Sequence, residues 1–93
     1  MEPTADVFRS ALQDGFVVEH GEARIELRLG EVQSLGDGYA EREAFALTFL
    51  GPVEPLLSQA TYRLVHEGLG ALDVFIVPVA RDAGAASYEA IFT

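Results

Sequence analysis

The 93-residue sequence contains no cysteine and no lysine. Without cysteine the chain has no disulfides and no thiolate nucleophile, and most structural zinc sites are excluded. Without lysine it has neither Schiff-base chemistry nor the lysine of a phosphate-binding P-loop. No apolar run reaches the roughly 18 residues of a membrane span. These absences remove several classes of enzyme and indicate that packing, with or without help from an interface, stabilises the fold.

Basic residues are scarce. Six arginines stand against fifteen aspartates and glutamates, so the net charge is −9. Nucleic acids and anionic membranes are bound by basic patches, so we expect neither as a partner. A basic protein partner is compatible with this charge, and so is a simple role of acidity in solubility. The start, MEPTADVF, has neither the basic end nor the apolar core of a signal peptide, so we expect cytoplasmic synthesis without one, followed or not by incorporation into an extracellular or particle assembly.

The N-terminal segment has the pattern of a short helix. Thr4 is placed to cap the first turn, Phe8 and Leu12 fall four residues apart on one face, and Gly15 supplies a stop. This pattern predicts a helix over residues 3–15, lying across a sheet.

Most of the remaining chain alternates apolar and polar residues, which is typical of half-buried strands. We expect strands over residues 16–20, 22–29, 44–50, 61–66, 71–79 and 88–92. Residues 31–40 contain Gly36, Asp37 and Gly38 and are expected to form a loop. Residues 51–60 contain two prolines and are expected to leave the sheet, with Leu56 and Leu57 packed back onto the core.

The predicted fold is therefore α+β, in a single domain over residues 1–93. An N-terminal helix packs on a twisted antiparallel sheet of five or six strands. We expect the second half to form a meander, because consecutive strands joined by short turns usually pair, and the sheet to curl into a partial barrel.

The run ALDVFIVPV at residues 71–79 is apolar on both faces, with Val74 and Ile76 on one side and Phe75 and Val77 on the other. A strand of this kind is expected to be covered on both sides. We expect the sheet core on one side and the N-terminal helix or a partner subunit on the other. A proline cannot donate to a strand ladder, so Pro78 is expected at the strand exit or at a bulge.

Chemistry-bearing residues are few. His66 ends a predicted strand and precedes Glu67, where an imidazole can act as a base or ligand, or can tie a tight turn by bonding to the backbone. An enzyme built on His66 with Glu67 or Asp73 is the corresponding catalytic hypothesis. His20, within EHGE, lacks the spaced third ligand of a metal site, so no metal and no cofactor is expected.

Tyrosines supply the remaining candidates, because a Tyr side chain suits either the rim of an interface or half-buried strand packing. Tyr39, Tyr62 and Tyr88 are of this kind. We assign no catalytic, cofactor-binding or metal-binding residue. The candidate interface or structural residues are Tyr62, His66, Val74, Phe75, Ile76, Val77 and Tyr88.

Four motifs in the second half resemble a family of small bacterial proteins classed only as a domain of unknown function. The motifs are F-A-L-T-F-x-G-P from Phe45 to Pro52, L-x-Q-x-x-Y-R-L-x-H from Leu57 to His66, L-G-A-L-x-x-F-I-V-P-V from Leu69 to Val79 and Y-E-A-I-F from Tyr88 to Phe92. The resemblance covers residues 42–93 well and the first 41 loosely. It is a family associated with neighbourhoods encoding phage tail-collar or microcystin-dependent-like proteins, so the resemblance implies a partner in a tail-fibre-like or surface assembly and no catalytic residue.

Two functional hypotheses from different classes follow. The first is a non-enzymatic structural or assembly protein of a phage-tail-like or surface-fibre system, which docks onto a tail-collar or fibre-like protein and forms a homo-oligomer if copies also associate. The second is a small-molecule-binding module with a pocket between helix and sheet, near Tyr62, His66 and Phe75. A space between helix and sheet that is filled by side chains argues against the second.

Overall fold

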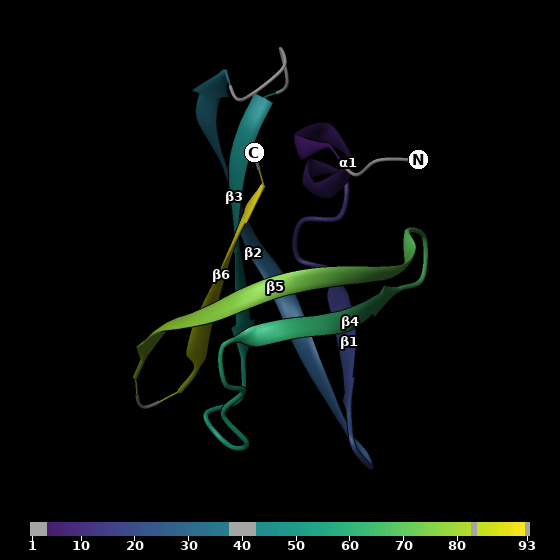
Figure 1. Cartoon of the computed structure of the whole chain (residues 1–93), viewed down its shortest axis with the longest axis vertical. Helices are drawn as coiled ribbons and strands as arrows, with labels where there is room; N and C mark the ends of the chain where they lie inside the picture. Colours follow the sequence, from purple (N-terminus) through teal and green to yellow (C-terminus); the bar gives the residue numbers. More distant parts are fainter. Residues whose placement is uncertain (1–3, 38–42, 83, 93) are drawn as a thin grey trace.

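The computed structural model describes residues 4–37, 43–82 and 84–92. All neighbouring strands are antiparallel, and the order β1-β2-β3-β6-β5-β4 closes into a ring (Figure 1). The closing contact between β1 and β4 is short, so the ring is not a regular barrel. The predicted α+β fold, one helix with an antiparallel sheet, is confirmed. The elements are α1 (Ala5–Arg9), β1 (Gly15–His20), β2 (Ala23–Asp37), β3 (Glu43–Gly51), β4 (Ala60–His66), β5 (Gly70–Arg81) and β6 (Ala86–Phe92).

Chain order and strand order differ at one place. β4, β5 and β6 form the expected meander, but β3 pairs with β6 rather than with β4. The proline-containing connection after β3 carries the chain away, and β4 then pairs with β1 through Val17–Val65 and Val18–Leu64. That pairing closes the ring, so β4 has a hydrogen-bonded neighbour on each side.

Helix α1 is shorter than the helix predicted over residues 3–15. Thr4 caps its start, as expected. The chain turns at Gln13, whose φ is 73°, and the Gln13 N–H donates to the Leu29 carbonyl oxygen at 2.7 Å. The expected stop, Gly15, is instead the first residue of β1. The helix ends at Arg9, tight turns follow, and the Gln13 bond joins the chain to β2 before the glycine is reached.

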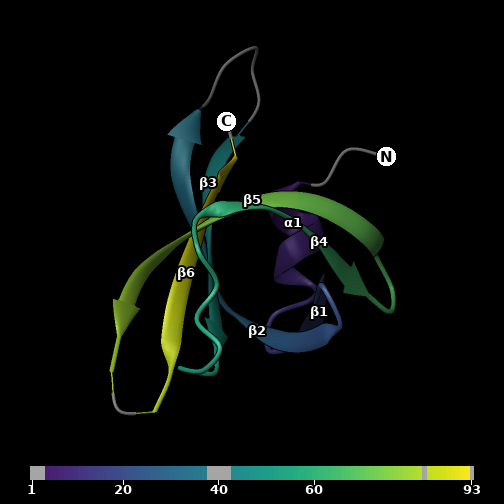
Figure 2. The ribbon, with the colours of Figure 1, turned by 60° about the horizontal axis from the view of Figure 1, so that its bottom comes forward.

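The helix packs at one end of the ring and directs Phe8 into the core, rather than lying over the outer surface (Figure 1). Phe8 is fully buried, and its ring centroid lies 6.5 Å from that of Phe16, 5.8 Å from that of Phe45 and 5.5 Å from that of Phe92. Figure 2 looks through the ring toward α1 behind it. The helix thus packs on inward-facing side chains at the end of the ring. The expectation that the helix covers the outer face of residues 71–79 is wrong, and cover by a partner subunit stays a prediction.

Strand β2 is longer than predicted. It continues to Asp37 instead of ending at Leu29, with irregularities between Leu29 and Glu31 and between Ser34 and Gly36. The loop expected over residues 31–40 is therefore strand as far as residue 37, because β3 pairs along this whole stretch. Residues 38–40, Tyr39 among them, lie outside the described residues.

Two tyrosine hydroxyls hold the connection between β3 and β4. The buried Tyr88 hydroxyl accepts a hydrogen bond from the Leu57 N–H at 2.9 Å, and the Tyr62 hydroxyl donates to the Ser58 carbonyl oxygen at 2.8 Å. Leu57 is buried, as predicted, whereas Leu56 is 44% exposed, so only one of the two leucines packs onto the core.

Replacing Tyr88 with Phe is expected to lower the free energy of unfolding by about 1–3 kcal/mol, because the Leu57 N–H is left buried without an acceptor. The matched change Tyr62→Phe should cost less, since Ser58 is exposed and water can reach its carbonyl. Urea unfolding of both variants measures the difference. Equal losses would show that the Tyr88 bond does not hold the connection.

Gly51, at the end of β3, lies against Leu27 of β2. A Cβ at this position would lie 2.5 Å from Cδ2 of Leu27, which is fully buried. Gly51→Ala is therefore expected to destabilise the fold by about 1–3 kcal/mol through overpacking. Gly84→Ala is the control, because a Cβ there meets nothing within 4 Å. Thermal unfolding that ranks the two variants equally would contradict this packing.

Candidate functional site

The outer face of β5 and β6 exposes a group of large apolar side chains. Phe75, Val79 and Ile91 are 51%, 54% and 52% exposed, and Val77 beside them is partly buried. These four residues are called the outer apolar patch. Isolated exposed apolar residues are ordinary, but a contiguous group on a small domain is typical of an interaction surface.

Strand register places the members of the patch together. Val77 of β5 pairs with Glu89 of β6, and Phe75 and Ile91 each lie two residues beyond that pair on the same face. A register shift between Pro78 and Ala80 places Val79 at a bulge, in agreement with the position predicted for Pro78. The patch therefore spans two adjacent strands.

The inner residues of the same strand are in the core. Val74 and Ile76 are 3% and 0% exposed, whereas Phe75 between them points outward. The sequence prediction that both faces of this strand are apolar is thus correct. Of the two covers expected for the second face, the helix is not there, and a partner subunit stays a prediction. Within the residues that the structure describes, no element covers Phe75.

Val79 and Ile91 were not among the residues singled out from the sequence. Val79 belongs to the apolar run of residues 71–79, and Ile91 alternates with the buried Ala90. Their membership in one patch depends on the pairing of β5 with β6 and on the bulge, neither of which a linear pattern specifies.

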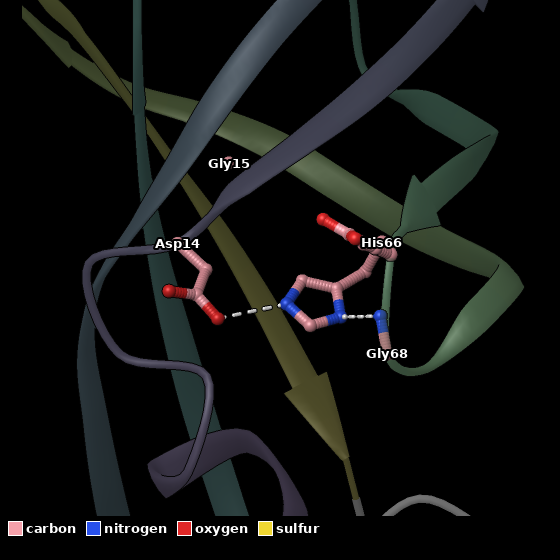
Figure 3. A pocket seen from close by; sticks show the side chains of 5 residues that line it. Asp14, Gly15, His66 and Gly68 are labelled. Carbon is pink, nitrogen blue, oxygen red and sulfur yellow. Dashed lines mark hydrogen bonds and ion pairs between the residues drawn. The ribbon is translucent and has the colours of Figure 1, made fainter.

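His66 forms the second candidate site, at the end of β4 (Figure 3). Its Nε2 lies 2.9 Å from the Asp14 carboxylate oxygen Oδ2, and its Nδ1 accepts hydrogen bonds from the N–H groups of Gly68 and Leu69, each at 3.0 Å. The ring also packs against Phe16, with centroids 4.7 Å apart. Because Nδ1 is an acceptor, Nε2 carries the proton that bonds to Asp14.

This arrangement uses both ring nitrogens of His66 for structure. One nitrogen binds the turn between β4 and β5, and the other joins that turn to the segment before β1. A general base needs a free nitrogen directed at a substrate proton. The arrangement therefore matches the turn-tying role considered from the sequence. Asp14, the partner 52 residues away, was not predicted, since nothing in the local pattern signals it.

The surroundings of His66 form an open hollow of about 510 Å³ lined by Asp14, Gly15, His66, Glu67 and Gly68. Glu67 lines it, as the catalytic hypothesis requires. Asp73 does not line it, because its carboxylate lies on the outer face, 3.4 Å from Arg63. Asp73 and the imidazole are thus on opposite faces of the sheet, whereas Glu67 lies beside the imidazole.

The remaining candidate residues lie in the core. Tyr62, Val74, Ile76 and Tyr88 are all at most 8% exposed, and their side chains pack inside the ring. The structure does not bring Tyr62, His66 and Phe75 around one pocket, because Phe75 points out of the ring. Of the seven candidates, Phe75 and Val77 are the ones available at the outer surface of the sheet.

The turn that follows the patch is held by a carboxylate. Asp82 accepts hydrogen bonds from the N–H groups of Gly84 and Ala85 at 3.0 and 3.1 Å. These backbone bonds stabilise the charged form, so the pKa of Asp82 lies below its ordinary value. The turn between β5 and β6 is thereby fixed close to Val79.

Among the described residues, no three His, Asp or Glu side chains are grouped closely enough to hold a metal ion. In the same part of the chain, no helix has the length and apolar character needed to cross a membrane.

The role of His66 predicts the ranking of its variants. Asn can replace Nδ1 as the acceptor for the turn, whereas Gln reaches further and replaces Nε2. His66→Asn is therefore expected to retain more stability than His66→Gln, and His66→Ala should lose about 1–3 kcal/mol. Urea unfolding gives the ranking. If Gln is the better replacement, the bond to Asp14 rather than the turn dominates.

Comparison with known proteins gives one match. No curated protein and no solved structure matches the chain. The family model described as a domain of unknown function, DUF6916, matches residues 3–92, which is nearly the whole chain. All the described residues, with their short helix and ring of antiparallel strands, lie within the matched segment. The chain therefore belongs to the DUF6916 family.

Proposed function

We propose that this protein is a non-enzymatic docking protein that binds another protein through the outer apolar patch. The observation that carries the proposal is the exposure of Phe75, Val79 and Ile91, each about half exposed on adjacent strands of a ring whose core is already complete. Aromatic and large aliphatic side chains at the centre of an interface contribute most of the binding free energy.

The size of the domain supports this role. A chain of 93 residues buries a limited fraction of its surface, so large apolar side chains are valuable in the core. Here the core contains the inner residues of β5, while Phe75 stays outside. A partner that covers Phe75 would remove apolar surface from water without any rearrangement of the ring.

The setting of the proposed docking is a phage-tail-like or surface-fibre assembly. This part of the proposal rests on the resemblance of the four sequence motifs, since the family description names no function. In that setting the protein is a structural subunit or an assembly factor that binds a tail-collar or fibre-like protein.

The small-molecule hypothesis has less support. The space between α1 and the sheet is occupied by Phe8, which is fully buried among Phe16, Phe45 and Phe92. The hollow beside His66 is open to solvent, and the two ring nitrogens that face it are already bonded. Ligand pockets are usually enclosed and mostly apolar, with a few converging polar groups.

Site-specific photocrosslinking in cells of the source organism tests the docking role. A benzophenone amino acid is placed at Phe75 or Val79, and at Arg24, an exposed control position on β2. We expect one discrete adduct with another protein from Phe75 and Val79 and none from Arg24. The same protein should co-purify with the unmodified chain and be lost from the double variant Phe75→Ser, Val79→Ser.

Two results would contradict the proposal. One is the absence of adducts at Phe75 and Val79, or the same set of adducts at all three positions. The other is an adduct with the mass of two copies of the chain, which would make the patch a contact between copies instead of a docking surface for another protein.

A further inference from the structure

The outer apolar patch is bordered by carboxylates. Strand register places Glu31 of β2, Thr48 of β3, Glu89 of β6 and Val77 of β5 in one row across the sheet. Glu31 and Glu89 are both exposed. Side chains in such a row alternate along each strand but share one face of the sheet, so both carboxylates face the same side as Phe75 and Ile91.

One described arginine lies beside this row. Arg28 pairs with Leu50, two residues from Thr48, so it shares the face of the row next to Glu31. In the part of the chain that the structure describes, Arg28 forms no ion pair with Glu31, and neither Glu31 nor Glu89 is ion-paired. Both carboxylates are exposed, so a cation on a surface that covers the patch can reach them.

From this charge complementarity we infer that the partner presents apolar side chains flanked by arginine or lysine, and that Glu89, with Glu31 further along the row, selects those cations. The inference rests on the proposed docking function and adds the chemical class of the partner. Glu89 lies between Val77 and Ile91, so one basic side chain reaches it from a surface that also covers both apolar residues.

A second copy of the chain fits this surface poorly. Each copy carries a net charge of −9, and a patch-to-patch contact would place the Glu89 carboxylates of both copies near one interface. Like charges brought together in this way oppose association, whereas a basic partner is attracted and steered to the patch. The attraction between exposed charges should weaken as salt is added.

Nuclear magnetic resonance titration with two designed peptides tests the inference. The first is a short peptide of alternating Arg and Val, and the second replaces every Arg by Glu. The ¹⁵N-labelled chain is titrated with each at low salt. We expect amide shifts around Phe75, Val77, Glu89 and Ile91 with the basic peptide, and weaker binding of the acidic one.

A charge-reversal pair sharpens the test. Glu89→Arg should raise the dissociation constant of the basic peptide about threefold and strengthen binding of the acidic peptide. Glu22→Arg changes the net charge equally, but it lies at the turn between β1 and β2, outside the carboxylate row. It should leave the ratio of the two affinities close to that of the unmodified chain.

Four outcomes would overturn the inference. Equal affinity of the two peptides for the patch would show that cations are not selected, although the patch still binds apolar side chains. Equal effects of Glu89→Arg and Glu22→Arg on the ratio of the two affinities would show the same. If neither peptide shifts the patch, the inference also fails, while the crosslinking at Phe75 still decides the docking function separately. Concentration-dependent shifts at the patch without peptide would identify a second copy as the occupant.

Discussion

The enclosure of Phe8 by the strand ring is the interaction on which the rest of the structure depends. Its ring meets aromatic rings from β1, β3 and β6, and Phe45 and Phe92 stack with their centroids 4.9 Å apart. The backbone contact that closes the ring involves only two residue pairs between β1 and β4. Side-chain packing around the helix therefore contributes to holding the closed form, since so short a ladder contributes little by itself.

This enclosure also explains the exposed patch. Among the described residues the one helix packs at the end of the ring, so no helix there covers the outer face of β5. Because side chains alternate along a strand, burying Val74 and Ile76 directs Phe75 outward. Phe75 therefore remains exposed at the surface, on the same face as the carboxylates of Glu89 and Glu31. The same geometry thus completes the core and leaves a surface suited to a partner.

Much of this arrangement follows from local patterns. Alternation predicts the six strands to within a few residues at most ends, and the doubly apolar character of residues 71–79 is real. The helix ends at Arg9, and beyond it the Gln13 N–H bonds to Leu29, a contact between separate segments. The extension of β2 past Leu29 depends on pairing with β3, and the partner of His66 is 52 residues away. The secondary-structure propensity of a residue and the spacing of apolar residues in a segment carry no information about contacts between distant segments.

The central claim is that Phe75 is an exposed residue of the outer apolar patch and does not stabilise the core. The most direct measurement is the free energy of unfolding of Phe75→Thr, a change that keeps a strand-forming residue at this position. The account predicts a loss within about 0.5 kcal/mol, as for an ordinary surface substitution. A loss of about 3–5 kcal/mol, typical of removing a buried phenylalanine, would show that Phe75 is part of the core and would contradict the account.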